Sequence, residues 1–212
     1  MGIWTDWMRR ARKKQAEAKP KQGNLVERLL QGQFFLMVLP VRGIELEEKY
    51  QCRSVEREKI PSFWKSWRDD QGLMLEVEGV GTCLFSTLVD ELPAKLQSRF
   101  RSYRCYVFGA NDTYGYFKIL EQGRIVRKIA SDGQIRFQGR SISSYPQVLG
   151  EPCAYEREQG ACWEMDHRAK WRKDQVVGFG RREVLDLLDY YVGLRNLTDG
   201  RIVSARVYQV YL

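Results

Sequence analysis

Residues 103–137 read YRCYVFGANDTYGYFKILEQGRIVRKIASDGQIRF. Four short runs within this stretch are rich in aromatic and β-branched residues, which favour strands. The runs cover 103–108, 114–120, 124–129 and 134–137. Asn-Asp, Gln-Gly and Asp-Gly pairs separate them, and these residues accept the positive φ angles of tight turns. The stretch therefore predicts an antiparallel meander of four strands.

The segments around this meander predict further strands. The near-continuous apolar run 34–41 is short enough to be a central strand that is buried on both faces. The runs 73–77 and 82–86 are expected to form a hairpin, because a Gly-Val-Gly sequence lies in the turn between them. The strongly β-prone run 202–212 predicts a strand that is added to the sheet.

Apolar residues at helical spacing predict the helices. The predicted helices cover 24–31, a short segment after Pro61, 90–100 and 181–192. Residues 139–180 show little periodicity, so we expect a long irregular excursion there. Together the elements predict a single α+β domain over residues 24–212, in which helices pack on a mainly antiparallel sheet. Residues 1–23 are expected to form a basic amphipathic arm and a linker.

The composition and charge are those of a folded protein that carries most of its excess charge on the arm. The chain has 212 residues, of which 43% are apolar and 29% charged, with a formal net charge of +8. Seven lysine and arginine residues against two acidic residues lie within residues 1–21, which leaves about +3 for the rest. A nucleic-acid-binding domain concentrates cations on its folded face. We therefore expect no nucleic acid as partner.

The arm predicts a short basic amphipathic helix, and two interpretations of it stay open. In the first, its tryptophans lie at the headgroup level of an anionic membrane and its cations contact lipid. In the second, the tryptophans dock on the protein's own core and the charges are solvated. The residues of the membrane-surface interpretation are Trp4, Trp7, Arg9, Arg10, Arg12, Lys13 and Lys14.

The sequence favours a reducing compartment and contains no apolar segment typical of a secreted or membrane-spanning protein. Its five cysteines are an odd number, and Cys83 and Cys105 lie in apolar strand-like runs, where a free thiol packs as a small hydrophobe. The N-terminus lacks an apolar signal region. We expect a cytoplasmic protein, with a peripheral position at the inner face of the cytoplasmic membrane under the first interpretation of the arm.

The sequence shows no constellation that would support catalysis. His167 is the only histidine, and a helix would place it about 140° from Cys162, five residues earlier. Adding Cys153 to these two matches no zinc pattern, so neither a metal nor another cofactor is expected. We expect a non-catalytic protein, and an enzyme with an unrecognised site built from cysteine, histidine and carboxylate groups is the alternative.

A basic and aromatic segment within 139–180 is the predicted partner-binding surface. Its candidates are Trp163, Arg168, Trp171 and Arg172, because tryptophan and arginine are enriched where proteins bind one another. Tyr114 and Tyr116 extend this surface if their strand faces outward. In the alternative interpretation Trp163 and Trp171 pin the loop to the core, while the charges face water.

Three short motifs carry a resemblance to a known group of proteins. They are Tyr114-x-Tyr116, then Gly123-Arg124-x-x-Arg127, then Gly150-Glu151-Pro152 with Glu156, followed by an apolar helix from Arg181. In this respect the chain resembles a loosely defined group of small bacterial proteins, some of which resemble immunity proteins encoded beside secreted antibacterial toxins. Tyr190 and Tyr191 stand in the region where a tryptophan would be expected in that group.

The resemblance implies a bacterial protein that binds and neutralises a cognate toxin or effector without catalytic residues of its own. Nuclease-directed immunity proteins are often acidic, whereas residues 22–212 here are slightly basic. A toxin that acts at the membrane or on its lipids is therefore the more consistent target. The second hypothesis is a peripheral membrane adaptor built around residues 1–21.

Deleting residues 1–21 tests the membrane interpretation of the arm. The full chain should cosediment with anionic liposomes, because tryptophans and cations of the arm would bind the headgroup region. The deleted protein should stay in the supernatant. Equal partitioning of the two proteins would remove the membrane role.

Overall fold

The computed structural model describes part of the chain. The described residues are 30, 33–44, 51–56, 59–60, 71–86, 102–111, 114–131, 134–137, 140–143, 147–160, 163 and 179–209. Their strands are β1 (Phe34–Leu39), β2 (Arg53–Ser54), β3 (Gln71–Val77), β4 (Gly81–Ser86), β5 (Cys105–Ala110), β6 (Gly115–Glu121), β7 (Arg124–Ser131), β8 (Gln134–Phe137), β9 (Arg140–Ser143), β10 (Gln147–Leu149) and β11 (Ile202–Gln209). Their helices are α5 (Ala154–Gln159) and α6 (Arg181–Tyr191), with 3-10 turns η3 (Leu194–Asn196) and η4 (Asp199–Arg201).

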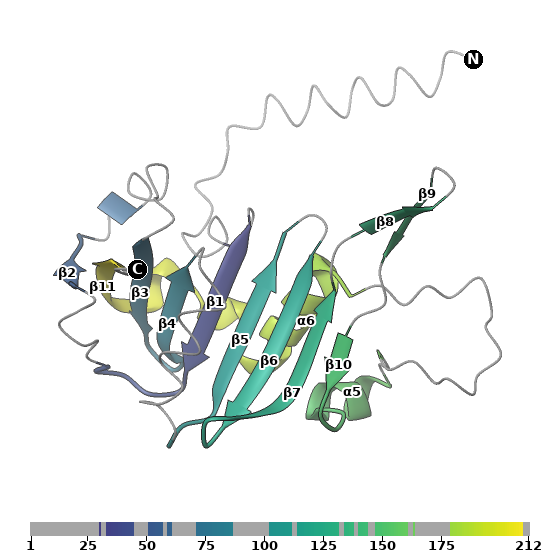
Figure 1. Cartoon of the computed structure of the whole chain (residues 1–212). Helices are drawn as coiled ribbons and strands as arrows, with labels where there is room; N and C mark the ends of the chain where they lie inside the picture. Colours follow the sequence, from purple (N-terminus) through teal and green to yellow (C-terminus); the bar gives the residue numbers. More distant parts are fainter. Residues whose placement is uncertain are drawn as a thin grey trace, which may run out of the picture.

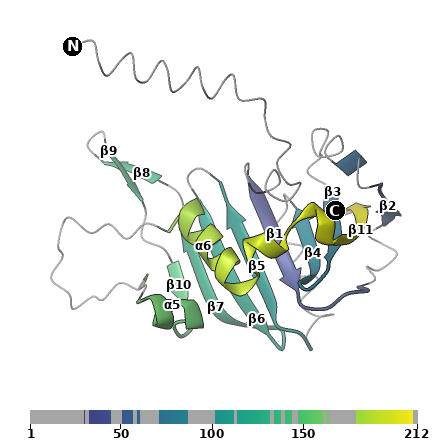
Figure 2. The same cartoon turned by 180° about the vertical axis from the view of Figure 1, so that it is seen from behind.

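Nine of the described strands form one antiparallel sheet, in the order β10-β7-β6-β5-β1-β4-β3-β11-β2. Strand β1 is in the middle of this order, which confirms the prediction of a central strand at 34–41. Helix α6 lies on one face of the sheet, as the two opposite views show (Figures 1 and 2). The architecture is dominated by the sheet and is consistent with the predicted α+β class.

Several predicted elements are confirmed. Strands β3 and β4 form the predicted hairpin, α6 occupies the predicted helix at 181–192, and β11 is the predicted final strand, paired with β3. The predicted helices at 90–100 and after Pro61, and the one at 24–31 except for Leu30, lie outside the described residues, as does the N-terminal amphipathic helix.

Two predictions about the segment after β7 are wrong. Strand β8 does not continue the meander, because it pairs with β9 in a separate two-stranded sheet. The place beside β7 is taken by β10, which pairs with it antiparallel. Residues 139–180 are thus not irregular throughout: they contain β9, β10 and helix α5. Three-residue and four-residue strands are too short to show a period of two in the sequence.

The strand register builds the core on the face that α6 covers. One apolar residue from each of eight strands lies in a single row across this face. The row is Val148, Ile129, Phe117, Phe108, Leu36, Phe85, Leu73 and Val207. Helix α6 packs Val184, Leu187 and Leu188 into the same cluster, so the helical spacing seen in the sequence marks its buried side.

On the opposite face, aromatic rings lie over glycines on neighbouring strands. Phe35 is paired with Gly109, and a Cβ atom on Gly109 would lie 2.0 Å from its ring. Tyr208 covers Gly72 in the same way, at 1.8 Å, and donates a hydrogen bond to the Phe85 carbonyl oxygen at 2.9 Å. Because the glycines have no side chain, the rings can lie flat against the sheet and fill the space above it.

A buried ion pair joins β7 to helix α5. Arg127 and Glu156 have side chains that are 1% and 2% exposed, and Arg127 Nε donates to Glu156 Oε2 at 2.8 Å while Nη2 donates to Oε1. Arg127 Nη1 also donates to the Gly150 carbonyl oxygen, and Glu156 Oε2 accepts the Cys153 N–H at 2.8 Å. The pair with these two backbone contacts, called the Arg127–Glu156 clamp below, therefore fixes both β10 and α5 against β7.

Removing one partner of the clamp should destabilise the protein strongly. The variants Arg127→Met and Glu156→Leu should each lose about 3 kcal/mol or more of unfolding free energy in urea, because each leaves a buried charge unpaired. The double variant should lose less than the sum of the two. Single variants that each lose under about 1 kcal/mol, as surface pairs do, would contradict a buried clamp.

Candidate partner-binding surface

A series of ring contacts connects the core to the surface at the C-terminal end of α6. Tyr191 stacks on Phe117 at 5.6 Å and on Tyr106 at 4.9 Å between ring centroids. Tyr190 contacts Tyr191 edge to face, at 4.9 Å. Tyr191 continues the buried side of α6. The residue before it, Tyr190, therefore points away from the core and is 37% exposed.

Tyr190 also contacts an aromatic side chain of helix α5. Tyr155 contacts Tyr190 edge to face at 5.3 Å and stacks on Trp163 at 6.1 Å. Trp163 contacts Phe179, just before α6, edge to face at 5.1 Å. The exposed ring of Tyr190 thus rests on aromatic side chains from both helices. Tyr190, Tyr155 and Tyr191 are called the tyrosine cluster below.

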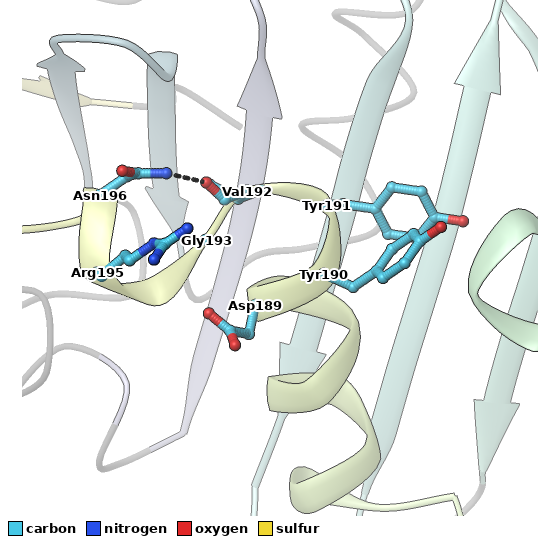
Figure 3. Close-up of a pocket in the computed structure, with 7 residues that line it drawn as sticks. All are labelled: Asp189, Tyr190, Tyr191, Val192, Gly193, Arg195 and Asn196. Carbon is cyan, nitrogen blue, oxygen red and sulfur yellow. Dashed lines mark hydrogen bonds between the residues drawn. The ribbon is translucent and has the colours of Figure 1, made fainter. Parts of the chain in front are cut away.

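An open depression of about 580 Å³ lies beside this cluster, lined by seven residues of the segment 189–196. Figure 3 shows Tyr190 and Tyr191 on one side of it and Arg195 and Asn196 on the other. Its polar groups hold the turn after α6 together. Asp189 Oδ1 accepts the Leu194 N–H at 2.7 Å, and Asn196 Nδ2 donates to the Val192 carbonyl oxygen at 3.0 Å. The wall of the depression is therefore a hydrogen-bonded scaffold with the exposed Arg195 on it.

The thiols of the three buried cysteines in the described part of the chain are poor nucleophiles. Burial raises the pKa of Cys83 to about 12 and that of Cys105 to about 11. Burial also raises the pKa of the Cys153 thiol, which is hydrogen-bonded to the Tyr191 hydroxyl. Burial, and then the contact with Cys153, raise the pKa of the Tyr191 phenol. Because the reactive form is the thiolate, these three thiols stay protonated and unreactive near neutral pH.

The predicted partner-binding residues that the structure describes are buried or half-buried. Trp163 is buried and not exposed, which fits the alternative interpretation that its side chain pins the loop to the core. Tyr116 is also buried, and Tyr114 is half-buried, so the condition that their strand faces outward is not met for Tyr116. The two tyrosine rings stack on each other, with 6.1 Å between their centroids, and both contact the ring of Phe35, so they pack against the sheet.

The other candidates lie outside the described residues. They are Arg168, Trp171 and Arg172 of the partner surface, Cys162 and His167 of the enzyme alternative, and Trp4, Trp7, Arg9, Arg10, Arg12, Lys13 and Lys14 of the membrane-surface interpretation. Among the described cysteines and carboxylates, no three come together in a way that could hold a metal ion. In the described part of the chain, no helix has both the length and the apolar character needed to cross a bilayer.

The sequence did not single out the tyrosine cluster as a surface, although one signal for it was present. The i, i+3, i+4, i+7 spacing that ends at Tyr191 fixes the buried side of the helix, so the adjacent Tyr190 must point outward. The contact with Tyr155 had no such signal, because it depends on where α5 docks.

Comparison with models of protein families, with curated proteins and with solved structures found no match to this chain. The geometry and chemistry of the described residues therefore carry the functional argument.

Thiol labelling tests the environment of the cysteines. At about pH 8, a maleimide should modify the exposed Cys52 in the native protein, whereas Cys83, Cys105 and Cys153 should react only after unfolding, because they are buried and protonated. Peptide mapping by mass spectrometry gives the modified positions. Native labelling of Cys83 as fast as that of Cys52 would show that β4 is not buried as described.

Proposed function

We propose that the chain is a non-catalytic protein-binding module that binds and neutralises a toxin-like protein. The observation that carries this proposal is the exposed ring of Tyr190, which contacts the aromatic rings of both Tyr155 and Tyr191. Tyrosine is enriched among the residues that dominate binding energy, and a ring that is already fixed loses little conformational entropy on binding.

The charges around Tyr190 favour a protein over a nucleic acid as partner. Glu158, Asp186 and Asp189 are exposed on α5 and α6, together with the cations Arg157 and Arg182 of these helices and Arg195 of η3. A hydrogen bond with Glu158 raises the pKa of the Tyr190 phenol. A surface of mixed sign matches the polar rim of a protein interface, whereas a phosphate backbone is bound by an excess of cations.

The resemblance to immunity-like proteins supports the same proposal in an indirect way. Arg127, Gly150 and Glu156, three of the residues that carry it, are joined in the clamp. Their role in this chain is structural, so recognition of the partner falls to other side chains, of which Tyr190 is the most exposed aromatic one on α6.

The finer parts of the proposal follow from the sequence. The chain would be a cytoplasmic bacterial protein with one domain over residues 24–212, and the arm 1–23 would bring it to the inner face of the membrane. The slightly basic domain fits a target that acts at the membrane or on its lipids better than a nuclease.

The protein encoded by the reading frame next to this chain's own is the partner to test. Produced alone in bacteria it should be toxic, and coexpression of this chain should restore growth. By calorimetry, Tyr190→Ala should weaken binding about thirtyfold or more, which corresponds to about 2 kcal/mol.

Val203→Ala is the control, because Val203 is 57% exposed but lies on β11, on the other side of β1 from the strands that α6 covers. This variant should bind like the original protein, and melting curves should show that both variants are folded. A neighbouring protein that is neither toxic nor bound by this chain would overturn the proposed function.

A further inference from the structure

The exposed ring of Tyr190 has carboxylates from both helices beside it. Its phenol is hydrogen-bonded to Glu158 of α5. Asp186 lies four positions earlier on α6, and an aromatic side chain in a helix leans back over the turn that contains this position. Both carboxylates are exposed. A partner that contacts the ring therefore meets two negative charges.

The order of charges along α6 adds to this negative character. The helix begins with Arg181 and Arg182, carries Asp186 at its middle and Asp189 in its last turn, and has no basic residue in that turn. The C-terminal end of a helix carries a partial negative charge, so cations are the favoured residues there. The order in α6 is the reverse. The end at which Tyr190 is exposed therefore attracts a cation from outside the helix.

The two phenols at the surface of the tyrosine cluster report the same sign. Burial, and then the charge of Asp186, raise the pKa of the Tyr155 phenol. The hydrogen bond with Glu158 is the first cause of the raised pKa of the Tyr190 phenol. Arginines of the two helices lower both pKa values, but to a smaller extent than these carboxylates raise them. At both rings the negative charges outweigh the positive ones.

The exposed arginines of this region lie away from the ring of Tyr190. Arg182 is eight positions before Tyr190 on α6, about 12 Å along the helix axis. Arg157 donates a hydrogen bond to the Pro152 carbonyl oxygen, before the start of α5. Figure 3 shows Arg195 across the depression from Tyr190. In the described part of the chain, the two carboxylates beside the ring form no ion pair with any of these arginines.

We propose that Tyr190, Glu158 and Asp186 form a site, called the arginine acceptor below, for an arginine side chain of the partner protein. The inference rests on the proposed function in one respect, that the partner is a protein, and it names the group that the partner places on Tyr190. A guanidinium group is attracted to a tyrosine ring, stacks on it through its planar surface, and can bind a carboxylate through two parallel hydrogen bonds. A lysine ammonium group has the charge but not the planar shape.

The exposed carboxylate of Asp186 has no structural contact that would explain it. In the described part of the chain, it takes part in no hydrogen bond and no ion pair. Replacing it should leave the melting temperature unchanged or slightly higher, because the substitution removes a negative charge from the C-terminal half of a helix. A loss of binding without a loss of stability separates a binding role from a structural one.

Two synthetic peptides of about seven residues test the arginine acceptor without the natural partner. One alternates serine and arginine, and the other alternates serine and lysine, so the two carry the same charge. In NMR titrations, the arginine peptide should shift the amide signals of residues 155–158 and 186–190 and should bind at least about threefold more tightly than the lysine peptide. No shifts, shifts that map elsewhere, or equal binding of the two peptides would overturn the proposal.

Two substitutions of Tyr190 separate the ring from its apolar surface. Tyr190→Leu should weaken binding of the arginine peptide at least about fivefold, because leucine keeps an apolar side chain but has no ring to attract a cation. Tyr190→Phe keeps the ring and should change the binding less than about twofold. If the leucine variant binds the arginine peptide as tightly as the phenylalanine variant does, no cation lies on the ring and the proposal is wrong.

Asp186→Asn and a matched control give the third measurement. Asp186→Asn should weaken binding of the arginine peptide at least about threefold, with an unchanged or higher melting temperature. Glu78→Gln is the control, because Glu78 is also exposed but lies in the turn between β3 and β4, on the other side of β1 from the strands that α6 contacts. Equal effects of the two variants would contradict the proposal. So would self-association of the chain in sedimentation that Asp186→Asn abolishes, because it would assign the site to a second copy.

The protein encoded by the neighbouring reading frame separates this inference from the proposed function. If it binds the original chain and Glu78→Gln equally but binds Asp186→Asn at least about fivefold more weakly, the arginine acceptor is part of the interface. If it binds Asp186→Asn as tightly as the original chain, the inference fails and the proposed function stands. If it binds none of them but the arginine peptide behaves as expected, the proposed function fails and the arginine acceptor remains a site for arginine-containing segments.

Discussion

The ion pair between Arg127 and Glu156 is the interaction on which the β10 side of this structure depends. Two charges removed from water are tolerated only when each is paired and its remaining hydrogen-bonding groups are satisfied. Here Glu156 accepts from the Cys153 N–H as well as from Arg127, and Arg127 donates to the Gly150 carbonyl oxygen. Because the pair joins residues 29 positions apart, it determines where β10 lies, where α5 begins, and so where Tyr155 meets α6.

Local patterns were enough to predict the elements that lie near the middle of the sheet. The apolar run of β1, the glycine turn between β3 and β4, and the helical spacing of α6 each act within a few residues, so the sequence shows them directly. Their burial follows from the same patterns. Strand β1 is central because all six of its side chains are apolar, and the structure buries five of them.

The elements near the sheet edge depend on contacts that no local pattern shows. The bulge at Val126 shifts the register of β7 by one residue: Arg127 pairs with Ile119, but Ile125 pairs with the next residue, Leu120, so Arg127 and Ile125 lie on opposite faces of the sheet. A prediction that assumes strict alternation of side chains between the two faces of the strand misses this shift. Trp163 is the corresponding case at the candidate site: its residue type suggested a surface anchor, but its surroundings, Tyr155 and Phe179, come from segments on both sides of it and bury it.

The pairing of β11 with β3 has a consequence for how the chain folds during its synthesis. Ser204 donates to Glu76 across 128 positions of sequence, and Tyr208 lies over Gly72 in the same ladder. Until β11 has been made, one edge of the β3–β4 hairpin has no partner strand, and open edges with apolar side chains are sites of aggregation. The ring of Tyr208 fits only over a residue without a side chain. This fit favours one register of β11 on β3, because a slip by one residue would place the ring against Leu73 or Gln71 instead.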